Sequence, residues 1–83
     1  MNSDVFNIKC FGIATDIIGE RTYQIESNSI KNVGELRLYL DSKFEQLKTL
    51  NNYMIAVNHS YALPEDCIDP SDEIAILPPV SGG

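Results

Sequence analysis

The feature that most constrains the fold is one helix-length segment among several strand-like segments. The helical segment begins near Asn32, where Glu35 has capping-box spacing, and its apolar positions recur every three or four residues. One helix and four or five strands can bury their apolar sides only if the helix lies across one face of a mixed sheet. The strand-like segments, with alternating or continuous apolar residues, are 5–11, 22–26, 53–58, 61–63 and 73–77.

The order of these segments predicts an α+β fold of the β-grasp type, the ubiquitin-like roll. The first and last strands are the most hydrophobic and belong in the centre of the sheet. A ferredoxin-like sandwich needs a second long helix, which the short segment 47–50 does not supply, and 12–21 reads as a connection with a turn at Gly19. We therefore predict a domain over 1–77, with a mixed four- to five-stranded sheet and one main helix on one face, and an extended tail over 78–83.

The predicted tail, Pro-Pro-Val-Ser-Gly-Gly, follows the last strand directly. Proline restricts φ and favours an extended residue before it, so six residues could reach about 20 Å. Glycine has no Cβ, so Gly82 and Gly83 are thin enough for a narrow channel. Small terminal residues are also common in chains whose ends are simply disordered. The closeness of the strand favours a tail that is presented to a partner.

Composition limits the classes of partner. The 83 residues are 43% apolar and 22% charged, as in a single globular domain, and no apolar run approaches the ~20 residues of a membrane span. The start, Met1–Asp4, lacks the basic stretch of a signal peptide, so we expect a cytoplasmic protein. The net charge of −6 and the scattered basic residues argue against nucleic acid and anionic membranes. Simple solubility and a basic protein partner both remain compatible with it.

The candidate chemical residues of the domain itself are few. Cys10 alternates with apolar residues and is expected to be buried, whereas Cys67 lies in a polar loop without evident chemistry. Two cysteines do not make a four-ligand metal set, so no metal is expected. His59, the only histidine, is expected in a turn rather than as a ligand or base. No Ser/His/Asp set or phosphate-binding glycine loop is present, and we expect no catalytic site on the domain.

The last strand has apolar residues on both sides. Ile74 and Ile76 point to one side, and Ala75 and Leu77 point to the other, with Phe11 as a candidate third member. Only one side can meet the helix. The other is either a set of scattered exposed apolar residues, which is ordinary, or a docking patch beside the start of the tail.

The end of the sequence is similar to that of the ubiquitin-like sulfur carrier family, which includes the small subunit of molybdopterin synthase. The likeness covers nearly the whole chain, although Ser71 stands where the family pattern has glycine, and Ile76 and Leu77 stand where it often has aromatic residues. The segments that carry the resemblance are 72–83, 55–58, 32–36 and 8–12 leading to 19–20.

This resemblance implies a sulfur carrier for molybdenum cofactor biosynthesis. An activating enzyme of the ubiquitin-activating type would consume ATP to adenylate Gly83, and sulfur would convert the adenylate into a thiocarboxylate. The large subunit would then use that sulfur on cyclic pyranopterin monophosphate. The chain would be the non-catalytic small subunit and co-substrate of a complex of two small and two large subunits, with no cofactor bound to it. The implied partner-binding residues are Phe11, Leu77, Pro78, Pro79, Val80, Ser81 and Gly82.

Three other functions remain compatible with the same pattern. They are a sulfur carrier for thiazole (thiamine) synthesis, a ubiquitin-like protein modifier, and a plain β-grasp interaction module. The Pro-Pro-Val-Ser sequence before the two glycines favours the pterin pathway.

Overall fold

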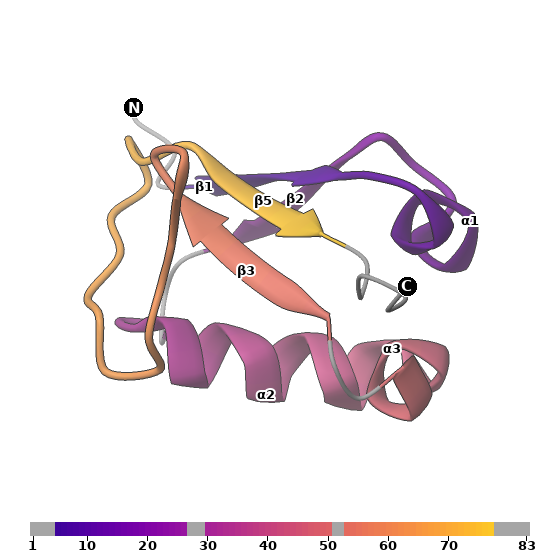
Figure 1. The fold of residues 1–83 in the computed structure, drawn as a ribbon. Coiled ribbons are helices and arrows are strands. Elements are labelled where there is room, and N and C mark those ends of the chain that lie inside the picture. The colour runs from indigo at the N-terminus through magenta and orange to yellow at the C-terminus, as the bar shows by residue number, and fades with distance from the viewer. Residues whose placement is uncertain (1–4, 27–29, 51–52, 78–83) are drawn as a thin grey trace.

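The computed structural model describes residues 5–26, 30–50 and 53–77, and within them the chain forms a sheet with three helices (Figure 1). In chain order the elements are β1 (Val5–Cys10), α1 (Ile13–Ile18), β2 (Thr22–Glu26), α2 (Val33–Lys43), α3 (Glu45–Leu50), β3 (Met54–Val57), β4 (Ser60–Tyr61) and β5 (Ile74–Leu77). Each predicted strand is present, with its ends shifted by two residues at most.

The sheet has the order β2-β1-β5-β3-β4. β1 and β5 pair in parallel at its centre, and the other neighbouring strands pair antiparallel. The first and last strands therefore lie side by side, as their hydrophobicity predicted. This mixed five-stranded sheet, with the main helix α2 between β2 and β3 in the sequence, confirms the β-grasp prediction.

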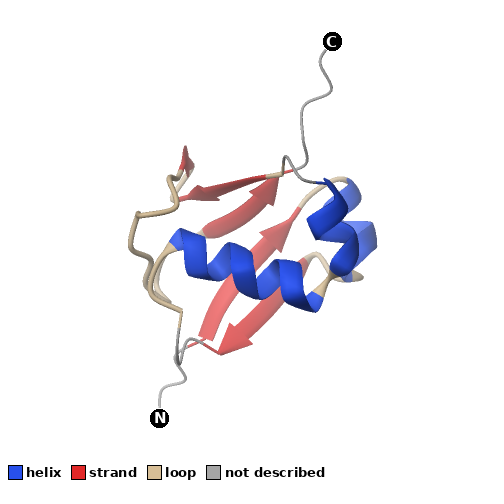
Figure 2. Cartoon of the chain, turned by 90° about the horizontal axis from the view of Figure 1, so that it is seen from below, coloured by secondary structure: helices blue, strands red, loops and turns tan. Residues whose placement is uncertain are grey.

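Helix α2 covers one face of the sheet (Figure 2). Its buried residues Val33, Leu36 and Leu40 follow the predicted helical spacing. The Asn32 side chain accepts a 2.8 Å hydrogen bond from the Glu35 backbone N–H. The Glu35 carboxylate in turn accepts a 2.7 Å bond from the backbone N–H of Lys31. The first bond satisfies an N–H group that the first turn of a helix leaves unpaired, and the second holds the residue before the cap against that turn. Together they fix where α2 begins.

The core lies between α2 and the sheet. Every second residue of β1 enters it, and the same holds for the two isoleucines of β5. Removing a large side chain from such a core typically costs about 2–5 kcal/mol, so these residues determine which sheet face is covered. The largest fully buried side chains are Phe6, Ile8, Leu36, Leu40, Leu47, Tyr53, Ile74 and Ile76.

Helix α1 is the main difference from the sequence prediction, because it lies in the stretch expected to be only a connection. Ala14 is fully buried and Ile17 packs against the core. The helix ends at Gly19, whose φ of 87° is left-handed and whose N–H bonds to the Thr15 carbonyl. Six residues make fewer than two turns, so the sequence shows too little periodicity to reveal a helix. α3 covers the short segment 47–50, which was expected to be helical or irregular and too short for a second long helix.

Candidate functional site

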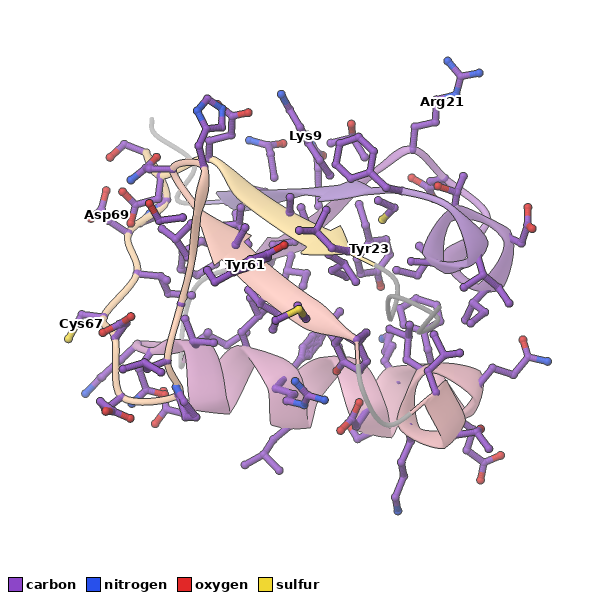
Figure 3. The ribbon with its side chains drawn as sticks, in the orientation of Figure 1. Lys9, Arg21, Tyr23, Tyr61, Cys67 and Asp69 are labelled. Carbon is purple, nitrogen blue, oxygen red and sulfur yellow. The ribbon has the colours of Figure 1, made fainter. Side chains whose placement is uncertain are left out.

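The sheet face opposite α2 carries a hollow of about 470 Å³. Its floor includes Ala56 of β3 and Ala75 of β5, which are register partners. On the other side of β5, Lys9 of β1 is the register partner of Ala75. Figure 3 shows the Lys9 side chain pointing away from α2. Two facing alanines leave space that larger side chains would fill, and this explains the depth of the hollow.

Aromatic and aliphatic side chains form much of the wall. Phe11 is 46% exposed and Tyr61 is 65% exposed, and Leu77 is half-buried. Phe11 and Leu77 lie toward the end of β5, and Tyr61 extends from β4 beside Ala56. The structure thus brings Phe11 and Leu77 together on one face, as the sequence suggested. Their role in partner binding stays a prediction.

A cluster of charged and polar groups borders the hollow where β5 begins. The Glu73 carboxylate oxygen Oε2 lies 3.0 Å from Lys9 Nζ and 3.3 Å from His59 Nε2. A hydrogen bond from Lys9, and a weaker effect of the one from His59, hold the pKa of Glu73 below its usual value. All three groups face solvent, so the cluster adds little to stability and remains accessible to a partner.

His59 belongs to a tight turn between β3 and β4, which confirms that it is a turn residue. Asn58 and His59 both have positive φ, at 53° and 72°. The Asn58 side chain accepts a 2.9 Å bond from the Glu73 backbone N–H and donates a 3.0 Å bond to Asp72. The Asn58 side chain therefore holds the turn between β3 and β4 against Asp72 and Glu73, which precede β5.

Sequence reasoning missed Lys9, Ala56, His59, Tyr61 and Glu73 as members of this surface. Strand alternation places Lys9 on the same side as Phe11, which was a usable signal. The others needed the pairing of β3 with β4 and β5, which the sequence does not show. The remaining predicted site residues, 78–83, lie outside the described part of the chain.

The other candidate residues lie away from the hollow. Cys10 is buried, and burial raises the pKa of its thiol. Cys67 is exposed, and Figure 3 shows it at the far side of the domain from Arg21. Within 5–26, 30–50 and 53–77, no three His, Cys, Asp or Glu side chains are grouped to hold a metal ion. None of the helices described is long and apolar enough to cross a membrane.

Sequence comparison gives a family match and a curated relative. A model of the ThiS family matches residues 8–83. The molybdopterin synthase sulfur carrier subunit of Caenorhabditis briggsae is 34% identical over 76 residues, which cover 88% of this chain and 90% of the relative.

Solved structures share the fold. SAMP1 from Haloferax volcanii superimposes with a TM-score of 0.77 at 23% identity, over 95% of this chain and 99% of that one. A complex of subunits 1 and 2 of molybdopterin-converting factor from Helicobacter pylori contains a chain with a TM-score of 0.65 at 29% identity, again over 95% and 99%. The first likeness shows the β-grasp fold alone, and the second shows such a chain in a two-subunit complex.

Proposed function

The chain belongs to the ThiS family of ubiquitin-like sulfur carriers, and from this membership we propose that it carries sulfur for molybdenum cofactor biosynthesis. The observation that supports the pterin pathway is the 34% identity to a molybdopterin synthase sulfur carrier subunit over 88% of the chain. The proposed partner is a large subunit of molybdopterin synthase, with two copies of each subunit. The two-subunit complex from Helicobacter pylori supports a partner of that kind.

The proposed reaction takes place at Gly83. A C-terminal carboxyl has a pKa of about 3.3–3.7, so at neutral pH it is an anion and a poor acyl electrophile. A partner enzyme with ATP would join the carboxylate to AMP and release pyrophosphate. Sulfide supplied by a sulfur donor would then displace AMP and leave a thiocarboxylate, which is a good nucleophile at neutral pH without a nearby base. The sulfur would attack the cyclic pterin to form a thioester, and water would then cleave the bond between the Gly83 carbonyl and sulfur. The sulfur would stay on the pterin, and the carrier would return as a carboxylate.

In this proposal the domain supplies recognition and the partners supply catalysis. The hollow beside Leu77 supports this division, because it offers apolar contacts next to the point where the predicted tail begins. Gly82 and Gly83 would enter the large subunit, which would hold the pterin. Since one pterin receives two sulfur atoms, two loaded carriers would act in turn.

Intact-mass measurement tests the proposal. The purified chain is first weighed to establish that Gly83 is its terminus, then incubated with the pterin-pathway activating enzyme, ATP and a sulfur donor. We expect the mass to rise by one oxygen-to-sulfur replacement, and fragmentation should locate it at Gly83. A reaction without ATP and a chain lacking Gly83 are the controls. An unchanged mass with an activating enzyme that loads its own known carrier would overturn the proposal.

A ubiquitin-like protein modifier is the second candidate. The likeness to SAMP1, at 23% identity, shows a shared fold and does not distinguish the two functions. The two functions differ in their product. A modifier yields a ladder of conjugates on a denaturing gel, whereas a pterin sulfur carrier yields dithiolene when mixed with the large subunit and cyclic pterin. A carrier for thiazole synthesis would instead donate sulfur only to a thiazole synthase.

A further inference from the structure

The turn at His59 places a large side chain in a backbone conformation that favours glycine. In two-residue hairpin turns the second position strongly favours glycine, because φ is positive there. His59 occupies that position with a φ of 72°. Its ring nitrogen Nε2 lies 3.3 Å from the Glu73 carboxylate, and its side chain is 80% exposed. Residues held in such backbone conformations often lie at functional sites. This points to a function for the His59 imidazole other than folding of the turn.

The position of the ring suggests that role. His59 lines the hollow whose floor contains Ala56 and Ala75. Leu77 lines the same hollow and is the last residue before the predicted tail. The histidine thus stands at one end of a depression whose other end adjoins the start of the tail.

The position of the predicted tail indicates which protein would occupy the hollow. On the proposed function, on which this inference rests, the large subunit holds Gly83. Six extended residues reach at most about 20 Å, so that subunit must come within this distance of Leu77. The hollow is the apolar surface beside Leu77 that lies within its reach. Interfaces are commonly anchored by one large side chain in a pocket of this kind.

We propose that Ala56, Ala75 and His59 form a socket for one aliphatic or aromatic side chain of the large subunit, and that His59 determines which subunit fits. The two alanines give the socket its depth. The imidazole closes the end at Glu73, where Lys9 and His59 share one carboxylate. A partner with a small or charged residue at the anchor position would leave the socket unfilled or bury an unpaired charge.

Filling the socket is the first test. In Ala75→Leu the new side chain occupies the space of the anchor, and we expect the Kd for the purified large subunit, measured by calorimetry, to rise at least about tenfold. Gln24→Leu is the matched control. Gln24 lies on the same sheet face, at β2, where it bonds to Asn7 outside the socket. The Gln24→Leu variant should bind the large subunit with a Kd within about twofold of that of the unaltered chain. If Ala75→Leu does not fold, Ala75→Val replaces it, with an expected rise of about fivefold.

The turn gives a second test that separates folding from binding. His59→Gly relieves the positive φ, so its melting temperature should rise by about 2–5 °C, while the loss of the imidazole raises the Kd about fivefold or more. His59→Ala should weaken binding equally without any gain in melting temperature. A chain that became more stable and bound as before would overturn the role of His59.

The outcomes also separate this inference from the proposed function. If the unaltered chain forms a thiocarboxylate and binds the large subunit, but Ala75→Leu binds as tightly, the socket is wrong and the sulfur carrier stands. If the unaltered chain does not bind the large subunit, both fail. If sedimentation shows that the chain forms a dimer, and Ala75→Leu disrupts that dimer, the hollow is an interface between two copies and the socket is again overturned.

Discussion

The Tyr53 hydroxyl donates a 2.7 Å hydrogen bond to the Asp41 carboxylate, which ties the residue before β3 to helix α2. Arg37 completes the arrangement, with its guanidinium 4.2 Å from the centre of the Tyr53 ring and a 3.0 Å bond to the Tyr53 carbonyl. The Tyr53 side chain is buried. This contact holds the start of β3, and so the strand that carries Ala56, against the helix layer.

Tyr53→Phe should therefore lower the free energy of unfolding by about 1 kcal/mol, because Asp41 loses a donor while the ring remains packed. Urea unfolding measures the change. Tyr61→Phe is the control, since that ring is largely exposed, and it should differ little from the unaltered chain. Equal stability of both variants would show that the Tyr53–Asp41 bond contributes nothing.

The same contact predicts a loss of stability at alkaline pH. Burial, and then Asp41, raises the pKa of Tyr53. A raised pKa in the folded state means that the contribution is complete below the unfolded pKa of about 10 and is lost as pH rises beyond it. Unfolding free energies measured from pH 9 upward should fall less steeply in Tyr53→Phe than in the unaltered chain.

The contact of Glu73 with Lys9 predicts a loss of stability at acidic rather than alkaline pH. The pKa of Glu73 is lowered in the folded state, so its small contribution is present above the unfolded pKa and is lost as pH falls through the folded one. Lys9→Met should raise the pKa of Glu73, as measured by NMR titration of its side-chain carboxyl. Lys48→Met, on α3, should leave that titration unchanged.

The first turn of α2 depends on its cap. Asn32→Ala removes the acceptor of the Glu35 N–H and should cost about 1 kcal/mol, or roughly 4–8 °C in melting temperature. Asn32→Ser keeps a side-chain oxygen at the same place and should retain most of the stability. A serine variant as unstable as the alanine variant would mean that the cap is not the cause.

The glycine end gives the sharpest functional prediction. Gly82→Ala, or an alanine added after Gly83, should leave the circular dichroism spectrum and melting temperature unchanged but abolish sulfur transfer. On the proposed function, the added Cβ or residue would not fit the narrow channel of the large subunit. Dithiolene formation with the purified large subunit is the readout. Leu38→Ala, at an exposed position on α2, should transfer sulfur normally. Full transfer by the extended chain would contradict the proposal.

Local patterns predicted much of this fold, and long-range pairing explains the rest. The strand over Thr22–Glu26 was predicted to the residue, and the capping box placed the start of α2. The family suggested by the terminal segment was confirmed. The depth of the hollow could not be foreseen, because it depends on Ala56 meeting Ala75 across two strands that are distant in sequence. The contact of His59 with Glu73 depends on the same pairing, since a turn pattern gives the shape of a loop but not its neighbour.

The parallel pairing of β1 with β5 has a mechanical consequence. β5 is hydrogen-bonded on both sides, to β1 and β3, so a force applied beyond Leu77 acts on a strand that is anchored along both edges. Sheet hydrogen bonds run across the strand direction, so traction along β5 loads both ladders in shear and must break many bonds together. A partner enzyme could therefore pull on the end of this chain, or release it, while the domain stays folded.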